Sequence, residues 1–322
     1  MGRLGITIPL ETVPLAEQRE WMAGIADLGF DDVWSFEGHD LDGFTPLVLA
    51  SQWAPTLRLG CALFPVQTRG PALLAQSLAA LCSAAPGRVV AGLGCSSPII
   101  VSDWNGIPFE KPYQYTRDTA LFLREVLAGK RVHHDYESFS VRGFGLHRGP
   151  PEPPPKLLLG ALRPGMLELS SRVADGVILN WLTPEDLATV LPHVRKHAPD
   201  GEVALRIIAT PSEDSEKVRA LARVWLAPYF NVPTYKAQQQ WLGREGELAS
   251  LWERWEAGDP KGAMAALSDE TVDAFYLHGP PERLHEAFER YFEAGVDTLI
   301  VGVLEQAMDP REATRRLGRD RG

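Results

Sequence analysis

The chain has 322 residues, of which 45% are hydrophobic and 23% are charged, and these proportions are close to globular averages. The composition therefore excludes a disordered or fibrous chain. The 32 Lys and Arg residues against 42 Asp and Glu residues give a formal net charge of −10, which argues against a general nucleic-acid-binding protein because such proteins need a basic surface.

Features of membrane, secreted and zinc-binding proteins are missing from the sequence. No apolar run reaches the length of about 18 residues that a membrane span needs. The N-terminal segment has neither the long apolar stretch nor the cleavage site of a signal peptide. The three cysteines, Cys61, Cys82 and Cys95, have no Cys-x-x-Cys spacing, which argues against a disulfide scaffold or a cysteine zinc site. We therefore expect a cytoplasmic protein with no membrane partner.

The first half of the chain alternates short apolar runs with amphipathic stretches. The apolar runs predict strands over residues 3–8, 32–36, 57–64 and 88–93. The stretches that follow them predict helices over residues 15–28, 45–53, 71–84 and 113–129. Strands that are apolar almost throughout, with a helix in every connection, are typical of a buried parallel sheet.

The same alternation resumes after an interruption. Residues 131–141 form an extended excursion, and the proline-rich run 149–155 cannot pair as a central strand. Further strands are predicted over residues 156–160, 176–180, 203–209 and 296–303. Helices are predicted over residues 163–174, 184–196 and 281–294, and residues 215–275 are expected to be helical throughout.

Eight strands in this order predict an α/β fold, a single (β/α)8 TIM barrel over residues 1–322. Its insertions follow strands 4 and 7 and cover about residues 95–112, 130–155 and 215–275. A doubly wound sheet is the alternative, and it needs a Gly-x-Gly-x-x-Gly turn. The closest match, Gly92-Leu-Gly-Cys-Ser-Ser97, lacks the third glycine, so this fingerprint is weak.

In a barrel of this kind the active site lies at the carboxyl ends of the strands. After strand 2 come Glu37, His39 and Asp40, which can donate or accept a proton. Alternatively, this is a polar loop whose acids cap the next helix. No further ligand at a fixed spacing supports a metal site.

The ends of strands 3, 4 and 5 offer contacts for a flat or phosphorylated ligand. Arg69 follows strand 3 and either binds an anion or begins the next helix. Gly94, Cys95 and Ser96 end strand 4, where backbone amides and hydroxyls can bind a ring or a phosphate, unless this turn serves only tight packing. After strand 5, Arg163 precedes a helix N-terminus, whose free amides favour a phosphate.

Several segments, in this order and spacing, resemble the luciferase-like monooxygenase superfamily, and in particular its branch of coenzyme F420-dependent oxidoreductases. They are Gly29-Phe-Asp-Asp-Val-Trp34 leading to Glu37, Thr56–Gly60 running to Thr68–Pro71, Pro86–Arg88 with Gly92–Gly94, Trp104–Gly106 with Phe109–Pro112, Gly160–Ala161 running to Met166, Val173–Gly176, and Gly279–Leu284 with Ala294–Asp297.

The resemblance implies a (β/α)8 barrel, often a homodimer, with the deazaflavin in the barrel mouth. It implies a non-proline cis peptide at Ala62–Leu63 behind the ring. It also implies that the backbone amides of Ala161, Leu162 and Arg163 bind the cofactor phosphate. This chain has Leu162 and Arg163 where the family often has glycine.

We therefore expect an enzyme that transfers a hydride between coenzyme F420 and a small organic substrate, with His39 and Glu37 near the reacting centre. Two alternatives stay open, namely a monooxygenase that uses flavin mononucleotide (FMN) and a barrel that binds a cofactor without turnover. Because F420 carries a phosphate and a glutamate tail, an acidic protein must place cations at the mouth. The candidates are Arg69, Lys111, Lys156 and Arg163.

Overall fold

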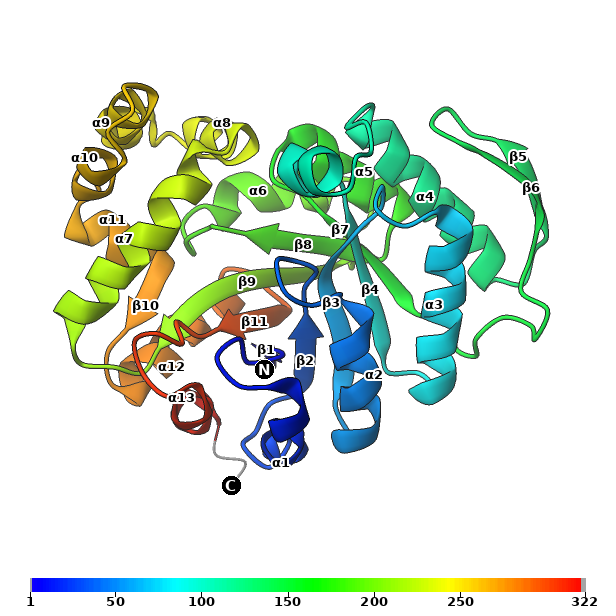
Figure 1. Cartoon of the computed structure of the whole chain (residues 1–322), viewed down its shortest axis with the longest axis horizontal. Helices are drawn as coiled ribbons and strands as arrows, with labels where there is room; N and C mark the ends of the chain where they lie inside the picture. The colour runs from blue at the N-terminus through cyan, green and yellow to red at the C-terminus, as the bar shows by residue number, and fades with distance from the viewer. Residues whose placement is uncertain (1, 320–322) are drawn as a thin grey trace.

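The computed structural model describes residues 2–319, so the outer bounds of the predicted domain, residues 1 and 320–322, lie outside the described residues. Eight parallel strands run in the order β9, β11, β1, β2, β3, β4, β7 and β8, and the pairing of β8 with β9 closes them into a barrel (Figure 1). The strands are β1 (Arg3–Thr7), β2 (Asp32–Ser35), β3 (Arg58–Pro65), β4 (Val89–Gly94), β7 (Lys156–Gly160), β8 (Gly176–Asn180), β9 (Glu202–Thr210) and β11 (Thr298–Gly302). The predicted TIM barrel is confirmed.

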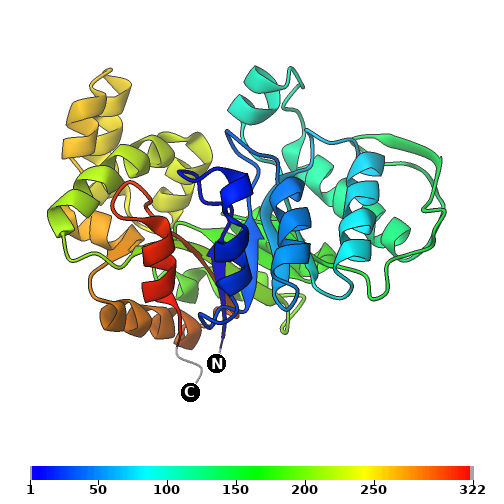
Figure 2. The same ribbon diagram turned by 60° about the horizontal axis from the view of Figure 1, so that its bottom comes forward.

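Helices surround the barrel, and several of them lie side by side along its outside in Figure 2. They are α1 (Arg19–Gly24), α2 (Phe44–Trp53), α3 (Pro71–Ala84), α4 (Pro112–Leu127), α5 (Pro164–Val173), α6 (Leu187–Val194), α12 (Pro281–Glu293) and α13 (Pro310–Leu317). Five of the eight begin with proline, which suits the first helical position because no intrahelical bond is lost there.

One predicted helix is divided, one helix was not predicted, and α6 begins three residues later than predicted. The helix expected over residues 15–28 is divided into a 3-10 turn over Leu15–Glu17 and the shorter α1. The C-terminal helix α13 was not predicted, because three arginines and a glutamate leave it few apolar residues. Among residues 2–319, no helix is long and apolar enough to cross a membrane.

The insertions after β4 and β9 are confirmed, and both rise on the side of the molecule away from the two chain ends (Figure 2). After β4 a π-helical turn, η2 (Ile99–Trp104), precedes α4. The hairpin β5 (Val132–Asp135) and β6 (Ser140–Phe144) follows α4, and residues 149–155 form no strand. The second insertion contains α7 (Ser215–Asn231), α8 (Pro233–Trp241), α9 (Glu245–Glu256), α10 (Pro260–Ala265) and α11 (Asp269–Phe275), and ends in β10 (Tyr276–His278), which pairs with β9.

The inside of the barrel is filled in layers because alternate residues of each strand point inward. A polar layer lies at the amino ends, where Arg58 bridges the carboxylates of Asp32 and Glu202 at 2.7 and 2.8 Å. Burial acts to raise the pKa of Glu202, but Arg58 and Lys156 outweigh it and hold the pKa at about 2. The apolar layer above consists of Trp34, Val90, Leu158, Ile178, Ala204 and Ile300. The next layer toward the carboxyl ends therefore forms the base of the site.

Candidate functional site

We call the space at the carboxyl ends of the eight barrel strands the barrel mouth. Three non-glycine residues of the described chain have positive φ, namely Ser96 after β4, Lys111 before α4 and Trp181 after β8. All three lie in segments that follow the carboxyl end of a strand. Left-handed backbone is unfavourable for such residues and concentrates at functional sites, so this end of the barrel is the candidate site.

One side of the mouth, which we call the β3–β7 wall, is formed by the ends of β3, β4 and β7. The Ala62–Leu63 peptide bond is cis, as the resemblance implied, and the register between β3 and β4 shifts between Cys61 and Phe64. A Cβ atom added at Gly94 or Gly160 would lie 2.6 or 2.4 Å from Leu63 Cδ2. The side chain of Leu63 therefore covers both glycines and forms an apolar surface across three strands.

Free backbone amides follow this wall at the start of α5. Leu167 is the first residue whose amide donates within the helix, to the carbonyl of Arg163, so the amides of Gly165 and Met166 before it have no intrahelical acceptor. The Ala161 amide already donates to the carbonyl of Ile178 at 3.1 Å. The amides open to a ligand therefore begin after Ala161, at Leu162 and Arg163.

Cys95 and Ser96 lie half-buried at the end of β4, next to the β3–β7 wall. Burial raises the pKa of the Cys95 thiol, so this side chain is a neutral, polarisable group at neutral pH. Ser96 has a φ of 60°, which turns the chain sharply after Cys95. The structure thus brings five of the predicted cofactor-binding residues to one side of the mouth: Ala62, Leu63, Gly94, Cys95 and Ser96.

The structure separates the three predicted proton-transfer residues after β2. The Glu37 carboxylate pairs with Arg69 Nη2 at 2.9 Å and accepts a hydrogen bond from the Gly43 amide at 3.1 Å. Glu37 therefore ties the loop after β2 to the loop after β3. His39 and Asp40 are exposed, and the His39 ring lies 4.7 Å from the ring of Trp104 in η2.

Arg206 lies across the mouth from the β3–β7 wall and was missed in the sequence. It is half-buried on β9, in line with the inward-facing Ala204. Its guanidinium lies 5.9 Å from the ring centre of Phe36. Among the described residues no carboxylate lies within ion-pair distance of it. The sequence feature that could have identified Arg206 is a charged residue within the otherwise apolar run Val203–Thr210.

Glu11 lies near Arg206 and was also missed. Both residues line a hollow together with Phe36, Gly302 and Glu305. Burial and the neighbouring Glu305 carboxylate raise the pKa of Glu11, and Arg206 opposes them. The rule that sites lie at strand ends, applied to the first strand, points to Glu11 because it follows β1 by four residues.

The second insertion supplies Tyr235, which no sequence pattern identified. The Asn180 amide donates to the Tyr235 hydroxyl at 3.4 Å, and burial raises the pKa of this hydroxyl to about 12. Two glutamines of α8 fix its position, because Gln238 and Gln239 donate to the carbonyls of Asn180 and Trp181 at 3.1 and 3.2 Å.

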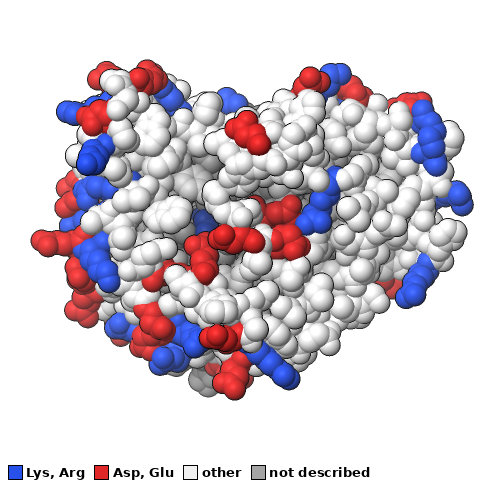
Figure 3. Space-filling model, viewed as in Figure 1, with Lys and Arg blue, Asp and Glu red and all other residues white. Residues whose placement is uncertain are grey.

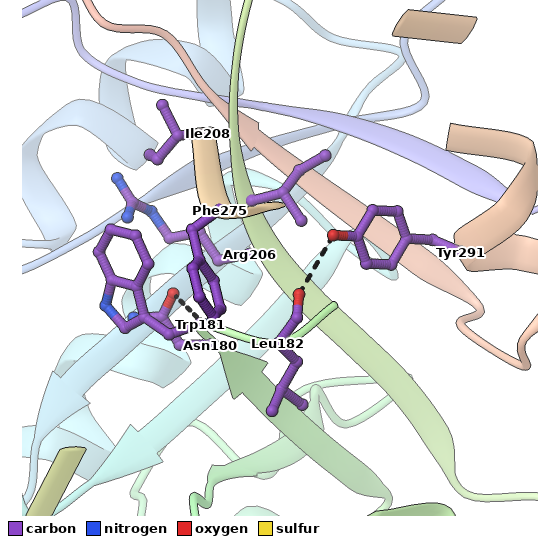
Figure 4. Close-up of a pocket in the computed structure, with 8 residues that line it drawn as sticks. Asn180, Trp181, Leu182, Arg206, Ile208, Phe275 and Tyr291 are labelled. Carbon is purple, nitrogen blue, oxygen red and sulfur yellow. Dashed lines mark hydrogen bonds between the residues drawn. The ribbon is translucent and has the colours of Figure 1, made fainter. Parts of the chain in front are cut away.

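A second hollow lies at the end of β8, and Figure 4 shows the residues that line it. Arg206 lines it together with Asn180, Trp181 and Phe275. On its far side the Tyr291 hydroxyl donates to the carbonyl of Leu182 at 3.1 Å. Arg206 therefore faces both hollows of the mouth.

The four cations expected at the mouth are not all there. Lys156 lies at the amino end of β7, where it pairs with Glu202 at 2.8 Å, so this prediction is wrong. It failed because Lys156 precedes its strand instead of following it. Arg69 is neutralised by Glu37, whereas Lys111 and Arg163 lie exposed on the carboxyl side. In Figure 3 acidic side chains gather near the centre of the face shown with a few basic ones beside them, and side chains of both kinds lie along its edge.

Comparison with known proteins assigns the family. The model of the luciferase-like monooxygenase family matches residues 3–298. The chain belongs to the luciferase-like monooxygenase family. It is 27% identical over 290 residues to a 5,10-methylenetetrahydromethanopterin reductase of Archaeoglobus fulgidus, a match that covers 86% of each chain.

Two solved structures share the family's barrel. The coenzyme F420-dependent tetrahydromethanopterin reductase of Methanopyrus kandleri superposes with a TM-score of 0.81 at 20% identity, covering 99% of this chain and 98% of that one. An F420-dependent secondary alcohol dehydrogenase, solved with an F420–acetone adduct, gives 0.75 at 18% identity and covers 99% of both chains. At these identities the likeness establishes the fold.

Among residues 2–319 no group of three or more His, Cys, Asp or Glu side chains could hold a metal ion. The chain's own residues at the mouth can transfer protons, bind anions and support a flat ring. His39 and Glu11 can exchange a proton, Arg206 and Arg163 can bind anions, and Leu63 offers an apolar surface.

Proposed function

We propose that this chain is an F420-dependent oxidoreductase, which transfers a hydride between coenzyme F420 and a small organic substrate at the barrel mouth. The observation that carries the proposal is the β3–β7 wall, where Leu63 makes a flat apolar surface over Gly94 and Gly160. Free amides follow it at the start of α5. A flat ring with a phosphorylated side chain needs both features on the same side of the site.

The residues of the wall fit the cofactor. Leu63, Cys95 and Ser96 would contact the deazaflavin ring, and the amides of Leu162 and Arg163 would bind its phosphate because a helix N-terminus favours an anion. The Arg163 side chain adds a positive charge at this point, and the structure gives it no ion pair among the described residues. When bound, F420 supplies a ring carbon that accepts or donates the hydride.

The loops after β1 and β2 supply the proton that accompanies a hydride. His39 is open to solvent and lies against Trp104, so it can exchange protons with water. Glu11 lines the hollow beside Arg206 and holds its proton over a wider pH range than an ordinary glutamate, because its pKa is raised. Glu37 keeps the β2 loop in place through Arg69, and Asp40 stays in solvent near Glu11.

The relatives support the choice of cofactor. Two of the solved structures that share the fold are named as F420-dependent enzymes. The Archaeoglobus relative is named as a 5,10-methylenetetrahydromethanopterin reductase. A reductase and an alcohol dehydrogenase act on different substrates, so the substrate of this chain is not transferred from them.

Turnover tests the proposal against both alternatives. The whole protein is mixed without oxygen with reduced F420 and a panel of carbonyl compounds, and the return of the oxidised deazaflavin absorbance is followed. We expect a saturable, substrate-dependent rate. Use of NADH that needs both FMN and oxygen would identify a monooxygenase instead. F420 binding without any change in absorbance, whatever the compound, would identify a barrel that binds its cofactor without turnover.

The same assay tests the proton-transfer role of His39. We expect His39→Ala to slow turnover by about a hundredfold, the usual contribution of general acid–base catalysis, with F420 still bound. The control is His147→Ala, because His147 is exposed and lies close after β6 of the hairpin. An unchanged rate for His39→Ala with bound cofactor would refute this role.

A further inference from the structure

We propose that the substrate carries a single carboxylate on a flat apolar body, and that Arg206 binds this carboxylate beside the rings of Phe36 and Tyr235. This inference rests on the proposed function, because it needs the cofactor to occupy the β3–β7 wall. It assigns to Arg206 the role of a substrate-binding residue.

The first argument is the missing partner of Arg206. The other half-buried guanidinium groups of the described chain have partners. Some pair with a carboxylate, as Arg58 does with Asp32 and Glu202 and Arg244 does with Asp186 at 2.8 Å. The others donate to a backbone carbonyl, as Arg88, Arg311 and Arg316 do. A charge that is partly removed from water is costly unless it is paired. Arg206 has no carboxylate within 4 Å among the described residues, although Glu11 lines the same hollow. A bound anion would supply the pairing that the chain does not.

The second argument is space around the guanidinium. A Cβ atom at Gly302 on β11 would lie 3.1 Å from Arg206 Nη2, so the glycine leaves room for this side chain. Two hollows of the mouth meet at Arg206, which is visible among the lining residues in Figure 4. A planar fork of N–H donors at this point suits bidentate binding of a carboxylate.

The third argument is position. In the closed strand order β9 and β3 are four strands apart in a barrel of eight, so they lie on opposite sides. A cofactor ring that rests on Leu63 of β3 would face Arg206 of β9 across the mouth. A substrate between them would present its reacting carbon to the ring and its far end to Arg206.

The surrounding groups define the substrate further. The Phe36 ring lies 5.9 Å from the Arg206 guanidinium, and the Tyr235 hydroxyl is bonded to Asn180, the residue paired with Arg206 in the sheet. Two aromatic rings favour a flat apolar body. Glu305 lines the same hollow and would repel a phosphate more strongly than a carboxylate, because a phosphate carries more negative charge.

Matched acids and amides test the inference. The protein is saturated with F420 and titrated by calorimetry with benzoate, phenylacetate and cinnamate, and with benzamide, phenylacetamide and cinnamamide. We expect at least one acid to bind at least about tenfold more tightly than its amide, as a charge-assisted hydrogen bond would give. Arg206→Gln should abolish this preference, and Arg206→Lys should restore part of it. Arg163→Gln is the control, which should weaken F420 binding and keep the preference.

Three results would overturn the inference. The first is that no acid binds more tightly than its amide, or that the acids bind without saturation. The second is that Arg206→Gln keeps the preference for acids. The third is that Arg206→Gln loses affinity for F420, which would place Arg206 on the cofactor. If the wild-type protein binds no F420, the proposed function fails. The same acid–amide titration of the cofactor-free protein and of Arg206→Gln then tests the carboxylate site by itself.

Discussion

At the scale of single residues, Glu11 has the environment of a group that holds a proton. It lies at the mouth, its backbone amide donates to Glu305 at 2.8 Å, and burial together with the Glu305 charge raises the pKa of its carboxyl group. A carboxyl group with a raised pKa is protonated at pH values where an ordinary glutamate is charged. It can therefore donate a proton to a substrate that receives a hydride.

This environment predicts a pH dependence. With Glu11 as the proton donor, the rate of substrate reduction falls as pH rises through the raised pKa of Glu11. Glu11→Gln should slow reduction by about a hundredfold and remove this fall. Glu305→Gln should move it to lower pH, because the loss of a neighbouring negative charge lowers the pKa.

The measurement is the pH–rate profile of each variant, with Glu286→Gln as the control because Glu286 is exposed on α12. A profile of Glu305→Gln that coincides with that of the wild type would contradict this assignment.

Some of these site residues could be predicted from the sequence, and others could not. The acid–histidine segment after strand 2 was recognisable because polar residues there interrupt an apolar run. The sequence could not indicate that Arg69 neutralises Glu37, because that pairing depends on how two loops meet. Arg206 lies within a predicted strand, so the rule that sites lie at strand ends does not select it. Tyr235 reaches the mouth only through the docking of α8, which no local pattern encodes.

At the scale of elements, the β3–β7 wall depends on two glycines from neighbouring strands. Gly94→Ala and Gly160→Ala would each place a Cβ atom less than 3 Å from Leu63 Cδ2, so Leu63 must move. We expect each substitution to weaken F420 binding by at least about tenfold and to lower the free energy of unfolding by about 1–3 kcal/mol, as overpacking does.

Fluorescence titration and denaturant unfolding measure these two effects. Gly24→Ala in α1 is the control, since a Cβ atom there meets nothing within 4 Å. If Gly94→Ala and Gly160→Ala both bind F420 like the control, the cofactor does not lie on this wall.

Element positions were largely predictable because buried parallel strands are apolar on both faces. All eight strands were found to within two residues. The elements missed were those whose stability comes from tertiary contacts. The polar helix α13 buries only Pro310, Ala313, Thr314 and Leu317. The strand β10 has three residues and pairs with the carboxyl end of β9.

At the scale of the whole molecule, a protein with a net charge of −10 can bind an anionic cofactor only if positive groups gather where the cofactor binds. The free amides at α5 with Arg163, and Arg206 across the mouth, provide two such places. The homodimer implied by the resemblance stays a prediction.

The measurement that tests the central claim most directly is titration of the cofactor-free protein with F420 and, separately, with FMN, followed by fluorescence. We predict saturable binding of F420, at least about tenfold tighter than that of FMN, and weakened by Arg163→Gln. Tighter binding of FMN, or F420 binding that does not saturate, would contradict the account.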